Sequence, residues 1–153
     1  MSAITPNLWF DGIALEAAEY YVGLFPNSRV TDVSRMGAEG PVITASFELD
    51  GNPFLALNGG PEFPFTEAVS FVIDCADQAE VDRYGDAFVA DGGVEGPCGW
   101  VKDRYGLSWQ LVPRALSELM ADPDPARAAR AGTALRTMHR IDITALQAAA
   151  DGD

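Results

Sequence analysis

The sequence predicts an α+β fold made of two successive βαβββ modules followed by a C-terminal helical extension. The order of strand, helix and three strands can be read twice along the chain, and the part after Pro113 is rich in alanine. With 153 residues, of which 48% are hydrophobic and 22% charged, the chain is expected to form one domain with an adequate core. We place the first module at about residues 4–58, the second at about 68–112 and the helical tail at about 113–150.

The first module begins with an apolar run at residues 5–10, which Asp11-Gly12 ends in the manner of a strand and turn. From Ala14 to Phe25, apolar side chains recur at intervals of three and four, which predicts an amphipathic helix. The Asp-Gly pair at 50–51 is a strong hairpin signal. Three runs have β character, at residues 29–36, 42–49 and 53–57, and the Asp-Gly pair lies between the second and the third.

The second module repeats this order with different residues. Residues 69–73 have strand character, residues 77–90 have helical spacing, and Gly92-Gly93 ends that helix. Short β-like pieces follow at residues 94–98, 100–102 and 107–112. Helical patterns then occupy residues 115–120, 125–138 and 143–149 of the tail, where the Asp-Pro-Asp-Pro sequence at 122–125 stops one helix and starts the next.

Composition and charge exclude several classes of partner. A formal net charge of -13 repels phosphate backbones and anionic lipids, so neither nucleic acid nor a membrane surface is expected to bind. The sequence has no apolar run of the roughly 18 residues that a membrane span needs, and no N-terminal basic region followed by an apolar run, so we expect a cytoplasmic protein. The two cysteines, Cys75 and Cys98, are too few for a disulfide scaffold and are expected to be reduced.

Several strings carry a resemblance to a known family. They are Thr5-Pro6-Asn7-Leu8-Trp9-Phe10, Leu57-Asn58-Gly59-Gly60-Pro61, Ala68-Val69-Ser70-Phe71 and the segment from Cys98-Gly99-Trp100 to Trp109-Gln110. In these segments the chain resembles the PhnB-like family of the vicinal oxygen chelate superfamily, which also contains glyoxalases and bleomycin-resistance proteins. The family often carries the label 3-demethylubiquinone-9 3-methyltransferase. The similarity continues through residues 122–125 and 141–143, so it covers nearly the whole chain.

The resemblance implies paired βαβββ modules, usually in a homodimer, with a ligand cleft in the curved sheet. A homodimer is also expected because a four-stranded module open on one side leaves strand edges and an apolar face to be covered. Members of the superfamily bind a divalent ion through His, Glu or Gln on the first, fourth, fifth and eighth strands. Here those strands offer Thr5, Asn7, Asn58, Ser70 and Gln110. Hydroxyls and amides are weak ligands for transition ions, so we expect no metal and no other cofactor.

Three further features are interpreted as structural, without a catalytic or cofactor-binding role. Gly59-Gly60-Pro61 leads into a loop rather than a helix, so it does not match a Gly-x-Gly cofactor turn, and binding of S-adenosylmethionine is not expected. His139, the single histidine, is interpreted as a surface residue of the tail. Cys98 is interpreted as a packing residue rather than an activated thiol.

Strand alternation suggests which side chains line the cleft. Asn7 shares a face with Trp9, and Ser108 shares a face with Gln110. The candidate ligand-binding residues are Asn7, Trp9, Asn58, Ser70 and Gln110, flanked by Trp100 and Trp109. An apolar pocket with a few neutral hydrogen-bonding groups suits a small, partly apolar or aromatic ligand. The alternative for the tryptophans is core packing, above all for Trp109.

Two functions from different classes remain open. One is a ligand-binding or sequestering protein that needs a cleft and no metal, comparable with the bleomycin-resistance members. The other is a metal-assisted enzyme, an isomerase, lyase or dioxygenase-like member that recruits an ion through Asn58, Gln110 and substrate oxygens. The sequence shows no carboxylate pair, Ser-His-Asp set or Cys-His pair in a spacing that would commit it to acid-base or covalent catalysis. Catalytic activity is therefore left open.

Overall fold

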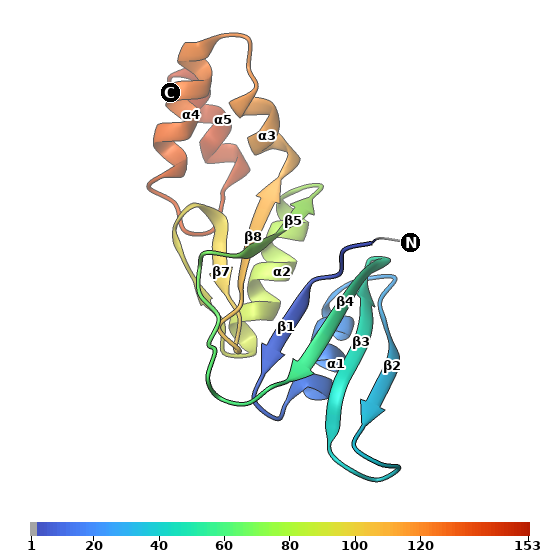
Figure 1. Cartoon of the computed structure of the whole chain (residues 1–153). Helices are drawn as coiled ribbons and strands as arrows, with labels where there is room; N and C mark the ends of the chain where they lie inside the picture. The colour runs from blue at the N-terminus through green and yellow to red at the C-terminus, as the bar shows by residue number, and fades with distance from the viewer. Residues whose placement is uncertain (1–2) are drawn as a thin grey trace. The chain divides into compact units, whose positions relative to one another are not determined.

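The computed structural model describes residues 3–153 and has the predicted α+β fold, with two four-stranded sheets. The order strand, helix and three strands occurs twice, and three helices follow (Figure 1). The chain divides into two compact units, one ending at Phe65 and the other running from Thr66 to Asp153. Each unit contains one sheet and the helix that covers it.

The first unit contains β1 (Asn7–Phe10), α1 (Ala14–Leu24), β2 (Arg29–Arg35), β3 (Val42–Leu49) and β4 (Asn52–Asn58). The strand order is β1-β4-β3-β2, in which β1 pairs parallel with β4 and the other pairs are antiparallel. The hairpin between β3 and β4 turns at Asp50 and Gly51, whose φ angles are 46° and 76°. Positive φ at both positions is what a two-residue type I′ turn requires, so the Asp-Gly signal is confirmed.

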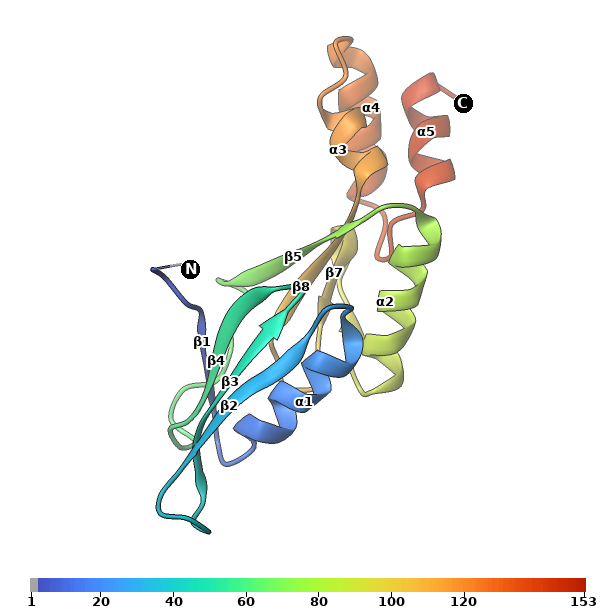
Figure 2. The ribbon, with the colours of Figure 1, turned by 90° about the vertical axis from the view of Figure 1, so that its right-hand side faces the viewer.

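The core of the first unit lies between its sheet and α1, which runs along one face of the sheet (Figure 2). Leu8, Phe47 and Phe54 alternate with exposed or half-buried neighbours along their strands, which directs them toward the helix. Tyr21 of α1 stacks on Phe47, with ring centroids 6.3 Å apart. The other face of this sheet carries Trp9, Leu55 and Leu57 together with polar side chains such as those of Thr44 and Ser46.

The second unit contains β5 (Ser70–Cys75), α2 (Gln78–Ala90), β6 (Val94–Glu95), a 3-10 turn, η1 (Pro97–Gly99), β7 (Trp100–Lys102) and β8 (Ser108–Pro113). The strand order is β5-β8-β7-β6, with β5 parallel to β8. Asp77 caps α2 by accepting the Glu80 N–H at 2.9 Å, and the Glu80 carboxylate accepts the Ala76 N–H at 2.8 Å. This reciprocal pair of bonds fixes where the helix begins. The run predicted as one strand at 94–98 is shorter, because the backbone enters η1 at Pro97.

The tail forms α3 (Arg114–Met120), α4 (Pro125–Leu135) and α5 (Ile143–Asp151), grouped beyond the end of β8 (Figure 1). These helices bury a small apolar cluster that includes Leu116, Leu119 and Leu146. The helix predicted at 125–138 ends at Leu135. The N–H groups of Thr137 and Met138 bond to carbonyls three residues back, which tightens and ends the last turn.

Within residues 3–153, no helix has the length and apolar character that crossing a bilayer would require.

Candidate ligand-binding face

The face of the second sheet that points away from α2 carries the main candidate site, and we call it the open face. The strand register shows which side chains lie on the open face. Ser70 pairs with Ser108, Trp100 pairs with Gln110, and Lys102 pairs with Ser108. Paired residues point to the same side of a sheet, so these five side chains share one face. Val72 and Val94 belong to the same face and are 61% and 67% exposed. The open face therefore combines exposed apolar side chains with a few polar ones.

Gln110 and Ser70 are joined on this face. The Gln110 side-chain amide donates a hydrogen bond to the Ser70 hydroxyl, with 2.9 Å between Nε2 and Oγ. A hydroxyl that accepts a hydrogen bond keeps its own proton for donation. The pair thus offers neutral hydrogen-bonding groups in the middle of the sheet.

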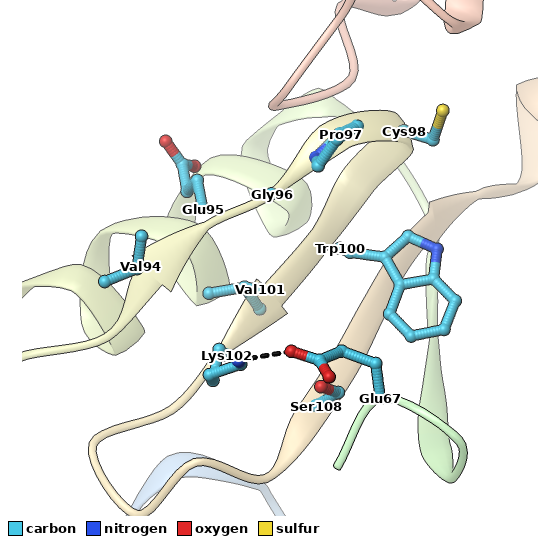
Figure 3. A pocket seen from close by; sticks show the side chains of 10 residues that line it. All are labelled: Glu67, Val94, Glu95, Gly96, Pro97, Cys98, Trp100, Val101, Lys102 and Ser108. Carbon is cyan, nitrogen blue, oxygen red and sulfur yellow. Dashed lines mark ion pairs between the residues drawn. The ribbon is translucent and has the colours of Figure 1, made fainter.

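A pocket of about 630 Å³ lies beside these residues, over β6 and β7. Its volume falls within the range usual for small-molecule sites. Figure 3 shows the residues that line it: Glu67, Val94, Glu95, Gly96, Pro97, Cys98, Trp100, Val101, Lys102 and Ser108. Trp100 provides the one aromatic surface of this lining, and its side chain is only half-buried.

An ion pair between Lys102 and Glu67 stands inside this pocket (Figure 3). The two side chains are 47% and 60% exposed, respectively. The hydrogen bond from Lys102 holds the pKa of the Glu67 carboxyl below its usual value, so the group is a carboxylate at neutral pH. Neither residue was among the predicted site residues. Lys102 could have been found, because it lies two residues from Trp100 on one strand, whereas nothing in the sequence ties the distant Glu67 to it.

The tail supports one wall of the pocket. Cys98 and Gly99 in η1 donate their backbone N–H groups to the carbonyls of Met138 and His139, at 2.8 and 2.7 Å. Gly99 has a φ of 83°, and a Cβ placed there would lie 2.6 Å from Ile141 Cδ1, so only glycine fits. Arg140 adds a bond of 2.6 Å to the Glu95 carboxylate. The shape of the pocket edge therefore depends on the segment between α4 and α5.

Trp109 lies on the opposite side of the second sheet from the pocket. Its side chain is 3% exposed and packs between Phe71 and Phe88, with ring centroids 5.6 and 5.7 Å away. Its indole N–H donates to the Asp103 carboxylate at 2.9 Å. Trp109 is therefore in the core that the sheet forms with α2, the alternative noted for it from the sequence.

Two of the remaining candidates, Asn7 and Trp9, share the face of the first sheet that points away from α1. The Trp9 indole N–H donates to the Gly60 carbonyl at 2.8 Å, and its ring meets Phe63 edge-on at 5.0 Å. A Cβ on Gly59 would lie 2.3 Å from the Trp9 ring. The double glycine thus lets the chain pass close to the indole, and Trp9 is largely covered by its own loop.

Asn58 faces α1, the side opposite to Trp9, because it pairs with Phe10 of β1. Its Oδ1 accepts the Ala14 N–H at 2.9 Å, and its Nδ2 donates to the Val42 carbonyl at 3.0 Å. Both ends of the amide are therefore bonded to backbone. Asn58 caps α1, which has no cap from its own preceding residue. The register therefore places Asn58 and Trp9, two of the residues expected to line one cleft, on opposite faces of the first sheet.

A separate groove of about 560 Å³ lies in the first unit, beside the start of α1. Ile13, Met36 and Val42 line it together with the acidic side chains of Asp11 and Glu16.

Comparison with known proteins identifies the family. The sequence model described as 3-demethylubiquinone-9 3-methyltransferase matches residues 2–112. The chain belongs to this PhnB-like family. A solved PhnB protein from Bacillus cereus is 32% identical, with a TM-score of 0.65, over 73% of this chain and 99% of that one. No curated protein matches.

More distant solved structures share the fold of this PhnB-like chain. A Pseudomonas aeruginosa protein is 20% identical, with a TM-score of 0.60, and the match covers 74% of this chain and 98% of that one. The fosfomycin resistance protein FosX from Listeria monocytogenes is 15% identical, with a TM-score of 0.53, over 74% of this chain and 93% of that one. These identities support the vicinal oxygen chelate fold and leave the ligand of this chain open.

The residues at the superfamily's metal-binding strands do not fit a resident transition-metal ion. Asn58 uses both ends of its amide on backbone groups, and Gln110 bonds to the Ser70 hydroxyl. Over the described part of the chain, residues 3–153, no group of three or more His, Cys, Asp or Glu side chains is arranged to hold an ion. Amides and hydroxyls alone are poor ligands for such metals.

Proposed function

We propose that this PhnB-like protein binds a small, partly apolar molecule in the pocket beside Trp100, without a resident metal ion. The observation that carries the proposal is the pocket of about 630 Å³ on the open face, with the Trp100 ring in its lining. A ligand that covers this half-buried ring and the exposed Val94 removes apolar surface from water, which favours binding.

Polar groups around the pocket supply orientation. Ser108 and Lys102 line it, and the Gln110–Ser70 pair lies on the same sheet face. A few polar groups in a mainly apolar site are the usual arrangement for small-molecule recognition. Binding or sequestration needs only such a lining and no reactive group.

The methyltransferase description of the family receives no support from the local geometry. The turn from β5 to α2 is made by Ala76 and Asp77, and Asp77 already caps the helix, so it lacks the glycine-rich phosphate cradle of Rossmann-like cofactor sites. Gly59 instead leaves room for the Trp9 ring, and the Gly60 carbonyl accepts the indole N–H. We therefore expect no binding when S-adenosylmethionine is titrated into the protein.

A neutral fluorescent dye, N-phenyl-1-naphthylamine, tests the binding site. We expect saturable binding of one dye per chain, and a loss of about tenfold in affinity for Trp100→Ala. Val89→Ala is the matched control, because Val89 is an exposed apolar residue of α2 outside the pocket lining. Thermal unfolding of each variant establishes that it is folded. Non-saturable binding, or equal losses in the two variants, would reject the proposed site.

Elemental analysis of the purified protein separates this proposal from the metal-assisted enzyme. We expect no stoichiometric Zn, Ni, Mn or Fe, because the candidate positions carry amides and hydroxyls. One tightly held ion per chain that is lost in Gln110→Ala would instead support the enzyme.

A further inference from the structure

We propose that Lys102 makes the pocket selective for apolar monoanions, and that the Glu67 carboxylate occupies the position that the ligand's acidic group takes. The proposal rests on the proposed function and names the class of ligand: a molecule with an aromatic or aliphatic body and one carboxylate. The body lies against Trp100, and the carboxylate replaces Glu67 at the Lys102 ammonium group.

The spacing of Trp100 and Lys102 matches such a molecule. They are alternate residues of β7, so their side chains leave the same face of the strand about 7 Å apart. One molecule with an aromatic body and an attached carboxylate is long enough to contact both side chains. The register of β7 with β8 also places Ser108 opposite Lys102, on the pocket side of the sheet.

Within the pocket, the charges favour an anion only beside Lys102. Lys102 is the one Lys or Arg among the residues that line the pocket, in a chain whose net charge is -13. Of the two acidic lining residues, Glu95 is engaged by Arg140 at 2.6 Å, and Glu67 is engaged by Lys102. Salt screens the distant negative charges over about 8 Å, so a direct contact with Lys102 dominates the recognition of a bound anion.

The Glu67 side chain is placed so that it can move away from Lys102. It lies in the turn before β5, outside any strand, whereas Lys102 is held within β7. Both side chains are substantially exposed, and exposed ion pairs contribute little to stability. A ligand that exchanges its own carboxylate for that of Glu67 preserves the charge contact and also buries apolar surface against Trp100. Glu67 therefore competes with an anionic ligand for Lys102.

A pair of probes of the same shape tests the inference: 2-naphthoate and the neutral 2-naphthamide, each measured by displacement of N-phenyl-1-naphthylamine. In the unmodified protein, 2-naphthoate is expected to bind about tenfold more tightly than 2-naphthamide. Glu67→Gln removes the competing charge and is expected to strengthen 2-naphthoate binding several-fold. Lys102→Met is expected to abolish the preference for the anion. Neither variant is expected to change the affinity for 2-naphthamide.

Arg104→Met provides the control for net charge. Arg104 is exposed in the turn after β7 and does not line the pocket. Its replacement by Met removes one positive charge, as Lys102→Met does. Three results would overturn the inference while leaving the pocket in place. The unmodified protein could bind the two probes with equal affinity, or Glu67→Gln could bind 2-naphthoate more weakly. Arg104→Met could also lose as much affinity for 2-naphthoate as Lys102→Met. If the dye itself does not bind in a saturable way, the proposed function fails first.

Discussion

The Trp109 indole N–H donates a hydrogen bond to the buried carboxylate of Asp103, 2.9 Å away. The other carboxylate oxygen of Asp103 accepts the backbone N–H groups of Tyr105 and Leu107, at 2.8 and 3.1 Å. One side chain thus closes the turn between β7 and β8 and anchors the tryptophan in the core. Trp100, Lys102 and Gln110 depend on this turn, because they lie on the two strands that it joins.

Replacing Asp103 with alanine is expected to lower the free energy of unfolding by about 2–4 kcal/mol, because three donors lose their acceptor in a buried place. Urea unfolding measures the change. Asp91→Ala is the control: it lies exposed at the end of α2, and its effect is expected to stay within about 0.5 kcal/mol. Equal effects of the two substitutions would contradict the role given to Asp103.

The two cysteines are expected to differ in reactivity. Burial raises the pKa of the Cys75 thiol to about 11, with smaller contributions from the nearby Glu80 and Asp74 carboxylates. Because the folded-state pKa lies above the ordinary value, the protonated thiol favours the folded state, and this contribution is lost as the pH rises from about 9 toward 11.

At pH 8, iodoacetamide is therefore expected to modify Cys98, which is half-buried at the pocket, and to spare Cys75. Mass spectrometry of the unmodified protein and of Cys98→Ser distinguishes the two sites. If Cys75 in the folded protein is modified at pH 8 as fast as Cys98, burial does not protect the Cys75 thiol.

Arg140 is expected to hold the tail against the pocket wall. It bonds to Glu95 and to Asp86 at 2.6 and 2.7 Å, and it lies directly over Gly85, where a Cβ would come within 2.8 Å of the guanidinium group. Arg140→Met is expected to speed amide hydrogen exchange at Cys98 and Gly99 by about tenfold, since their carbonyl partners are in the same segment. Arg136→Met, an exposed position in the tail, is expected to leave both amides unchanged. Unaltered exchange in Arg140→Met would remove Arg140 from this role.

We also propose that the protein is a two-fold symmetric homodimer. The exposed side chains of Val69 and Val72 lie in or beside β5, outside the pocket lining, and a second chain could cover this apolar surface. Light scattering at micromolar concentration is expected to give a mass of about twice the 16.3 kDa of one chain. A mass near 16.3 kDa at physiological salt would reject the dimer.

The order of elements could be predicted from the sequence because local patterns determine it. Helical spacing from Ala14 and from Asp77, together with turn signals such as Asp50-Gly51, gave element positions within a few residues of those observed. Strand ends were less certain: the run predicted at residues 5–10 begins pairing at Asn7. Such ends depend on tertiary pairing, which local patterns do not contain.

The site was harder to predict, because the face of a strand depends on its partner's register. Phe54, Ala56 and Asn58 alternate with Leu55 and Leu57, so both faces of β4 look apolar from the sequence, and only the pairing of Asn58 with Phe10 directs its amide toward α1. Glu67 could not be predicted at all, because it reaches Lys102 only through the folded sheet. The family resemblance and strand alternation pointed to amides and tryptophans, whereas the structure shows the ion pair of Lys102 and Glu67.

A crystal structure with N-phenyl-1-naphthylamine bound would show whether the pocket beside Trp100 is the ligand-binding site. We expect density for one dye per chain on the open face, in contact with Trp100 and Val94, in the pocket of about 630 Å³. Density confined to the groove of about 560 Å³ beside α1, or a pocket that stays empty at saturating dye, would contradict it.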